Sequence, residues 1–272
     1  MRMNPASSSF RSDLAGVWRR LQVLPDDEAG ATVSAQRPTV VRLQAGPWFA
    51  QWMQEPAERA VPAVPLCDLA PMQLAALTEQ QACWGVCHLD AHPEGEVAHW
   101  LPRVDFQPPN LQSDAGWLLF DQPERCIEID THSDRSQVWV REPGTAWQAD
   151  EVWCLQGLDA DGHDDGRVLL GAGPWRVYLR PRRGRWPRGL QPGLTLHDLL
   201  LHQPDDALSW LDHELSLGRC EGTRCDIVLS SLPASRGGQR HTTIAWHDDG
   251  QRAWVRWGDD EGWWRPLPAS PP

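Results

Sequence analysis

The chain lacks an excess of positive charge. It has 272 residues, and 25 Lys and Arg stand against 37 Asp and Glu, so the net charge is −12 at pH 7. Because a phosphate backbone attracts a basic surface, this balance argues against nucleic acid as a partner. No stretch approaches the about 18 consecutive apolar residues of a membrane-spanning helix, and no apolar N-terminal run resembles a signal peptide. We therefore expect a cytoplasmic protein with no membrane partner.

The chain also lacks the familiar motifs of catalysis and cofactor binding. It contains no Gly-x-Ser-x-Gly, P-loop, His-Glu-x-x-His, dinucleotide fingerprint or Cys-x-x-Cys. Cys83 and Cys87, on one strand, would stand about 13 Å apart, too far for one zinc ion. Cys220 and Cys225 flank a predicted turn and can approach each other, although reduced, mostly buried thiols are the favoured interpretation for all seven cysteines. We expect no catalytic residue, no metal site and no cofactor.

Tyrosine is nearly absent, with one residue against 17 Trp, whereas Pro and Gly are abundant at 24 and 22. Turn-forming residues spread through a chain favour many short strands over long helices. Tryptophan suits such strands, because it buries a large area and carries a single donor. The composition therefore predicts an all-β protein.

Two segments of the chain recur in the same order. Ala45-Gly46-Pro47-Trp48 returns as Ala172-Gly173-Pro174-Trp175, and the segment 129–141 returns as 244–256 with the same Trp-Val-Arg at its end. A repeat of this kind predicts two copies of one fold. We expect Trp48 to be equivalent to Trp175, and Trp139 to be equivalent to Trp254.

Each copy is predicted to be a meander of short antiparallel strands. In the first copy, residues 39–52 are expected to form one long strand bent at Gly46-Pro47. Short helices are expected over 71–77 and 194–202, at corresponding places in the two copies. Closure of each meander into a barrel would remove its exposed edge.

The predicted fold class is therefore all-β, with two tandem antiparallel up-and-down (calycin-like) β-barrels and short helical inserts. We expect a flexible N-terminus over 1–12, a first barrel over 13–144 and a second barrel over 145–272.

Gly16-Val17-Trp18, near the start of this pattern, is similar to the Gly-x-Trp that opens lipocalins, in which the Trp plugs the closed end of the barrel. The segments 41–50, 103–109 and 137–141 resemble bacterial calycin-like proteins related to the fungal Hri-type duplicated-barrel family. The resemblance implies two lipocalin-like barrels in one chain and gives Trp18 the role of barrel plug. It transfers no catalytic residue.

Acidic residues and histidines gather at three predicted turns. The groups are His132 with Asp134, His247 with Asp248 and Asp249, and the acidic loop of Asp159, Asp161 and His163-Asp164-Asp165-Gly166. Such groups could ligate a divalent metal or act as a general base. Because Asp and Gly are also the residues that tight turns require, we favour a purely structural interpretation.

Six tryptophans of the first copy are candidates for a ligand pocket. They are Trp48, Trp52, Trp84, Trp100, Trp117 and Trp139. An eight-stranded barrel leaves an interior just wide enough for side chains, so these residues either line a cavity or fill the barrel. The leading hypothesis is a non-enzymatic protein that binds a small apolar or aromatic ligand in the first barrel. The alternatives are a protein–protein interaction scaffold with solid barrels and an enzyme that uses His88, His99 or His132 at a barrel mouth.

Overall fold

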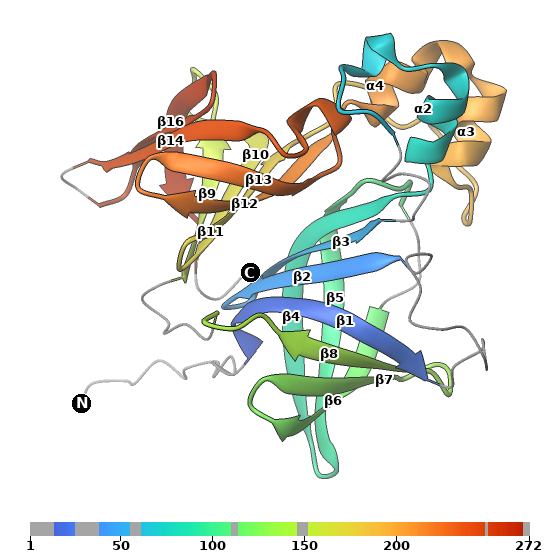
Figure 1. Cartoon of the computed structure of the whole chain (residues 1–272), viewed down its shortest axis with the longest axis vertical. Coiled ribbons are helices and arrows are strands. Elements are labelled where there is room, and N and C mark those ends of the chain that lie inside the picture. Colours follow the sequence, from blue (N-terminus) through green and yellow to red (C-terminus); the bar gives the residue numbers. More distant parts are fainter. Residues whose placement is uncertain are drawn as a thin grey trace.

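The chain forms two closed, eight-stranded antiparallel barrels in tandem (Figure 1). This architecture comes from a computed structural model that describes residues 14–24, 38–54, 61–109, 114–145, 152–247 and 250–268. It confirms the predicted all-β class with two barrels and short helices. The N-terminus expected to be flexible, over 1–12, lies outside the described residues.

The first barrel is a meander in which every strand pairs with the next, and the eighth pairs back onto the first. One end carries the tight turns after β2, β4 and β6, and the opposite end carries the longer connections, including that from β3 to β4. The strands are β1 (Gly16–Leu24), β2 (Thr39–Ala45), β3 (Trp48–Gln54), β4 (Gln81–His92), β5 (Gly95–Asp105), β6 (Asp114–Gln122), β7 (Arg125–Asp130) and β8 (Ser136–Arg141).

The second barrel repeats this order, and its last strand closes onto its first. Its strands are β9 (Val152–Leu158), β10 (Asp164–Ala172), β11 (Trp175–Arg180), β12 (Glu214–Glu221), β13 (Arg224–Ser230), β14 (Gln239–Trp246), β15 (Ala253–Trp257) and β16 (Asp260–Pro266).

The repeated Ala-Gly-Pro-Trp segment is the hairpin turn between the second and third strands of each barrel. Its glycine needs a left-handed backbone, with φ of 60° at Gly46 and 52° at Gly173. Trp48 and Trp175 therefore occupy equivalent positions, as predicted. The expected single long strand over 39–52 is wrong, because Gly46 and Pro47 reverse the chain between two strands.

The second proposed equivalence is wrong. Trp139 lies in the eighth strand of its barrel, whereas Trp254 lies in the seventh strand, β15. Trp139 is buried, and Trp254 is 38% exposed on the outer face. All hairpins of a meander share one alternating pattern, so the sequence match joined two hairpins from different places in the barrel.

Three clusters of buried apolar side chains hold the molecule together. One fills the first barrel around Trp18 and Trp100, and another fills the second barrel around Tyr178 and Trp257. The largest lies between the barrels and draws on the outer faces of both. Strand β2 contacts β10, its own counterpart, so the two barrels meet through equivalent surfaces.

The helical inserts of the two repeats also come together (Figure 1). Helix α2 (Pro71–Leu77) precedes β4, while α3 (Leu196–His202) and α4 (Ala207–Leu211) precede β12. Leu77, Leu196 and Leu211 are buried in the cluster between the barrels. These helices confirm the predicted inserts, and no described helix has the length and apolar character needed to cross a membrane.

Candidate ligand-binding site

The interior of the first barrel holds an ion pair. The Arg42 guanidinium lies 2.9 Å from a carboxylate oxygen of Glu128, and both side chains are almost inaccessible to solvent. The guanidinium also lies 3.6 Å from the ring centre of Trp100 and 4.3 Å from that of Trp139. The Trp100 indole N–H donates to the second oxygen of Glu128 at 3.2 Å. The ion pair, the two indole rings and the indole hydrogen bond together offset the cost of burying these two charges.

Little space remains beside this ion pair. The interior cavity measures about 10 Å³, which is room for about one water molecule. Of the tryptophans singled out in the sequence, Trp100, Trp139 and Trp18 line it. Trp18 lies in β1, close to the barrel end with the tight turns, and its indole N–H donates to the Leu14 carbonyl at 2.8 Å.

The other four candidate tryptophans lie outside the barrel interior. Trp48 and Trp52 face the second barrel, where their indole N–H groups donate to the carbonyls of Pro268 and Leu215. Trp84 stacks on Trp48 at 5.4 Å, and Trp117 contacts the His92 ring at 5.0 Å. The six tryptophans therefore do not share one cavity, because alternate residues of a strand point to opposite faces.

A larger pocket, of about 300 Å³, opens at the mouth of the first barrel, at the end with the longer connections. This volume is at the lower end of the range for small-molecule sites. The described lining comes from β3, the start of β4 and the turn before it, the end of β5 and the loop after it, and a loop of the second barrel. It consists of Gln51, Thr78, Glu79, Gln81, Ala82, Cys83, Asp105, Gln107, Pro108, Pro109, Gly193, Leu194 and Thr195.

Three of these residues form a row across adjacent strands. Gln51 is directly opposite Cys83, and Cys83 is directly opposite Asp105. Gln51 contacts the interior residue Arg42, and Cys83 packs against the interior cluster, so the row faces into the barrel. Neighbouring strands lie about 4.8 Å apart, so the ends of the row are separated by about 10 Å at the backbone.

The Gln51 amide has a fixed orientation. The Nε of Arg42 lies 2.8 Å from Oε1 of Gln51, and a guanidinium can only donate, so the amide oxygen must face Arg42. The amide NH₂ is left to face the pocket, and no described residue accepts a hydrogen bond from it. The buried ion pair thus holds a hydrogen-bond donor in place at the mouth.

Asp105 supplies the opposite chemistry. One of its carboxylate oxygens accepts the backbone N–H of Gln107 at 2.9 Å. Burial raises the pKa of Asp105 to about 6, against the opposing effect of the Arg182 charge. Burial also raises the pKa of the Cys83 thiol, with a further contribution from Asp105, so Cys83 stays protonated at neutral pH. The row therefore presents an amide donor, a neutral thiol and a carboxylate.

Gln107 joins the second barrel to this mouth. Its amide nitrogen donates to the carbonyls of Thr78 and Gln80, both at 2.7 Å, and its oxygen accepts the backbone N–H of Leu196 at 3.1 Å. Leu196 begins α3, directly after the loop residues 193–195 that line the pocket. The second barrel therefore supplies part of the wall of a pocket in the first.

None of these lining residues was predicted as a site residue from the sequence. Gln107 falls in the segment 103–109 that carries the family resemblance, but a glutamine has no motif that marks it as a site residue. Each of β3, β4 and β5 carries one polar or small residue facing the mouth, namely Gln51, Cys83 and Asp105, and only the strand pairing brings the three together.

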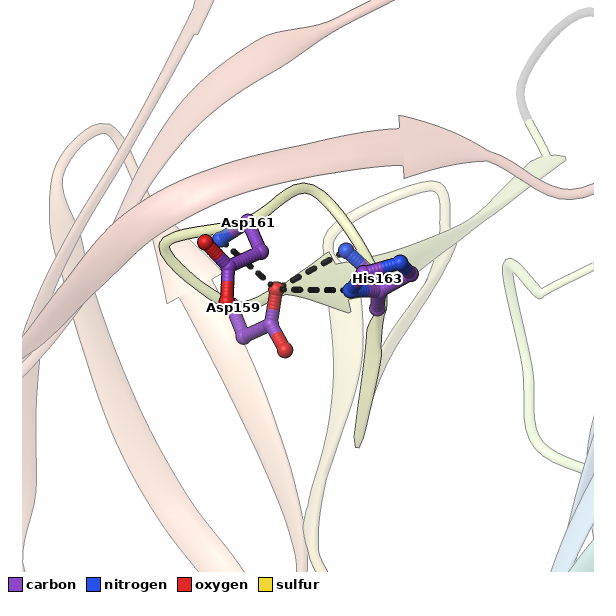
Figure 2. A group of neighbouring side chains, drawn as sticks. All are labelled: Asp159, Asp161 and His163. Atoms are coloured by element: carbon purple, nitrogen blue, oxygen red, sulfur yellow. Dashed lines mark hydrogen bonds and ion pairs between the residues drawn. The ribbon is translucent and has the colours of Figure 1, made fainter.

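The acidic loop at Asp159, Asp161 and His163 brings three possible ligand groups within 4.8 Å of one another, all of them exposed. Figure 2 shows that one Asp159 oxygen is already used: it accepts the backbone N–H groups of Asp161 at 2.9 Å and His163 at 2.8 Å. The carboxylate thus closes the turn.

The histidine turns are similar. The Asp130 carboxylate accepts the backbone N–H of His132 at 2.7 Å and the Ser133 hydroxyl at 2.9 Å. His88 is exposed in β4, opposite His99 in β5, away from the mouth pocket. Asp248 and Asp249 lie outside the described residues.

The expectation of seven reduced thiols is wrong at one pair. Cys220 and Cys225 form a disulfide between β12 and β13. The backbone N–H of Cys220 donates to the Pro174 carbonyl, as that of Cys87 does to Pro47, so Cys87 is the first-barrel counterpart of Cys220. Opposite Cys87 lies Trp100, not a second cysteine.

Comparisons with protein-family models, curated proteins and solved structures gave no match for this chain.

Proposed function

We propose that this protein is a non-enzymatic binding protein that holds a small polar molecule at the mouth of its first barrel. The observation that carries the proposal is the pocket of about 300 Å³, in which the buried Arg42–Glu128 pair fixes the Gln51 amide. A site with preset hydrogen-bond geometry loses less entropy when a ligand binds.

Polarity of the lining favours a polar ligand over the apolar one expected from the tryptophans. The interior cavity of about 10 Å³ is too small for an apolar molecule. An apolar group at the mouth would cover Gln51 and Asp105 without bonding them, at a cost of about 1–3 kcal/mol for each unpaired polar group.

The lining also supports binding over catalysis. Its described part contains no histidine, and its one thiol, Cys83, has a raised pKa. The Thr78 hydroxyl lies 3.2 Å from the His197 ring, but it donates to the Ala75 carbonyl at 2.6 Å, so His197 does not take its proton. A nucleophile activated by an adjacent base is therefore missing among the described lining residues.

Kinship with the calycins belongs to the same proposal. Two closed up-and-down barrels, with Trp18 inside the first near its tight-turn end, support it. In the lipocalin resemblance this tryptophan plugs the closed end of the barrel, and the pocket lies at the opposite end.

The test is to fill the pocket. Gln81 is exposed at the rim, so Gln81→Trp should block the pocket and leave the core intact. Gln239→Trp, at an exposed strand start in the second barrel, is the matched control. Native mass spectrometry of the purified protein, followed by a thermal-shift screen of small polar compounds, should detect binding that Gln81→Trp removes and Gln239→Trp keeps.

Two outcomes would contradict the proposal. One is that no compound from the screen binds wild-type protein. The other is that every binder is unaffected by Gln81→Trp. In either case the interaction scaffold with solid barrels would become the better hypothesis.

A further inference from the structure

We infer that the molecule bound at this mouth is an organic cation, with an ammonium or amidinium group on Asp105 and an oxygen acceptor on Gln51. The inference rests on the proposed function, because it names the chemical class of ligand for the same pocket.

The wall of the pocket is acidic. Its described lining contains two carboxylates, Asp105 and Glu79, and no basic side chain. An anionic group placed here would meet two like charges, whereas a cation would be attracted. The acidic net charge of the whole chain acts in the same direction.

The nearest basic groups already have partners. Arg42 is bonded to Glu128 and Gln51. Arg182 donates to the carbonyls of Asp105 and Phe106, both at 2.7 Å, and to that of Trp210 at 3.0 Å. Since these bonds point the two guanidinium groups at protein oxygens, neither offers its donors to a ligand.

The Asp105 carboxylate has unused capacity to accept hydrogen bonds. It offers about four lone-pair sites, and among described residues it accepts from the backbone N–H of Gln107 and, less strongly, from that of Phe106. In a partly buried position, a cationic donor would give a charge-assisted bond, about twice as strong as a neutral one. A neutral ligand would gain much less from the same oxygens.

The row of residues sets the spacing of the ligand. The Gln51 NH₂ lies at one end, the Asp105 carboxylate lies at the other, and Cys83 lies between them. With about 10 Å between the end backbones and both side chains reaching inward, the two groups suit a compact molecule with its cation and its acceptor a few bonds apart.

Three probes of matched shape test the charge. They are 4-aminobutanamide, which carries an ammonium group, pentanamide, which is neutral, and glutaramate, which carries a carboxylate in place of the ammonium group. Titration calorimetry should show the tightest binding for 4-aminobutanamide. Asp105→Asn should weaken that binding at least tenfold and remove the preference for 4-aminobutanamide over pentanamide.

A labelling experiment on the wild-type protein avoids reliance on a variant. The chain contains no lysine, so apart from its N-terminus it has no amine to compete with the probe. A water-soluble carbodiimide should activate the Asp105 carboxyl group, and the 4-aminobutanamide nitrogen should then form an amide with its carbon as the carbodiimide leaves as a urea. The peptide that contains Asp105 should gain the probe's mass sooner than peptides with exposed carboxylates such as Asp161.

The outcomes separate the two proposals. If pentanamide or glutaramate binds as tightly as 4-aminobutanamide, and Gln81→Trp removes that binding, the charge inference is overturned and the proposed function stands. Slower labelling of Asp105 than of Asp161 would also overturn the inference. If none of the three probes binds and the screen of polar compounds finds no other binder, the proposed function fails, and the inference fails with it.

Discussion

Arg42 of the first barrel and Leu169 of the second occupy the same position, three residues before the alanine of the repeated Ala-Gly-Pro-Trp turn. Both face the interior of their barrel. One strand further along, Gln51 in β3 corresponds in the same way to Tyr178 in β11. Tyr178 stacks on Trp257 at 5.3 Å, inside an interior cluster made of apolar and aromatic side chains. The same strand order therefore holds the buried Arg42–Glu128 pair inside one barrel and an aromatic cluster inside the other, where the Tyr178 hydroxyl donates to Asp260.

The difference shows which parts of the repeat have been kept. Trp48 and Trp175, at the joint between the barrels, are the same residue in both copies, whereas the interior positions differ in charge and size. In the first barrel, the polar interior residue Arg42 contacts Gln51, which lines the mouth pocket. The second barrel contributes the loop 193–195 to that pocket and is otherwise stabilised by its own aromatic core.

The most direct test of the difference between the two interiors is to remove one residue of the Arg42–Glu128 ion pair. Glu128→Ala should leave Arg42 buried and uncompensated, at a cost of about 3–5 kcal/mol in the free energy of unfolding. Chemical denaturation followed by tryptophan fluorescence measures this loss. A loss below about 1 kcal/mol would mean that water reaches Arg42 and that the interior is not closed.

The control for this variant replaces both residues of the ion pair, so that the interior of the first barrel becomes apolar. Arg42→Leu combined with Glu128→Leu should cost less than Glu128→Ala, because both charges are removed together and only the Trp100 indole N–H loses its acceptor. In the same variant Gln51 loses the donor that fixes it, so binding at the mouth should weaken although the fold is kept.

The second test compares the two tryptophans that the sequence wrongly aligned. Trp139→Ala should destabilise the protein by about 3–5 kcal/mol, since Trp139 is buried against Arg42. Trp254→Ala should cost less than about 1 kcal/mol, because Trp254 lies on the outer face. Equal losses in urea denaturation would contradict the placement of these two tryptophans on opposite faces of different strands.

The third test acts on the second barrel alone. The Cys220–Cys225 disulfide closes a short loop, and its removal should cost about 2 kcal/mol in the chain-entropy account. Thermal melting with and without a thiol reductant should show the loss in wild-type protein. Cys225→Ala should melt identically in both conditions, and a reductant effect that persists in this variant would show that the disulfide is not its cause.

The last test concerns pH, and its effect has opposite signs at Asp105 in the first barrel and at Asp198 in helix α3. The pKa of Asp105 in the folded protein is about 6, above its ordinary value of 3.8. The folded state therefore holds a proton that the unfolded state releases, and stability is lost as pH rises from about 4 through 6. Asp105→Asn should match wild type near pH 4 and exceed it in stability above pH 7.

Asp198 in α3 is the counterpart with the opposite sign. Hydrogen bonds from the backbone N–H and hydroxyl of Thr195 lower the pKa of Asp198, so its contribution is present at neutral pH and is lost in acid. Asp198→Asn should therefore be less stable than wild type at pH 7 and equal to it in acid. Urea denaturation at the two pH values measures both variants, and a shared sign would contradict this explanation.

Sequence patterns predicted the barrels but not their inner and outer faces. Both faces of β2 are buried, since Arg42 and Gln44 point inward while Val41 and Leu43 point at the second barrel. The alternation of side chains along β2 therefore could not distinguish the face inside the barrel from the face that contacts the second barrel. The more apolar of the two is the face outside the barrel. For the same reason the tryptophans at the joint between the barrels were mistaken for candidates to line the interior.

The mouth pocket could not be predicted from the sequence, for a related reason. Gln51, Cys83 and Asp105 are spread over three segments of the chain, and strand register alone brings them into one row. Register depends on the pairing of whole strands and on the bulge at Arg103 in β5, opposite Trp84 and Gly85, and a local pattern contains neither. The repeated turn, by contrast, was predictable, because its glycines meet a local backbone requirement.

The contact of β2 with β10, and of one helical insert with the other, has a consequence for how such a site can arise. Two identical barrels joined through equivalent faces obey a two-fold symmetry, and any change in one mouth must appear in the other. Covalent linkage in a single chain lifts that restriction. One barrel can then change to form a pocket, while the other barrel changes independently to supply part of the pocket wall. A homodimer of identical barrels cannot separate these two roles.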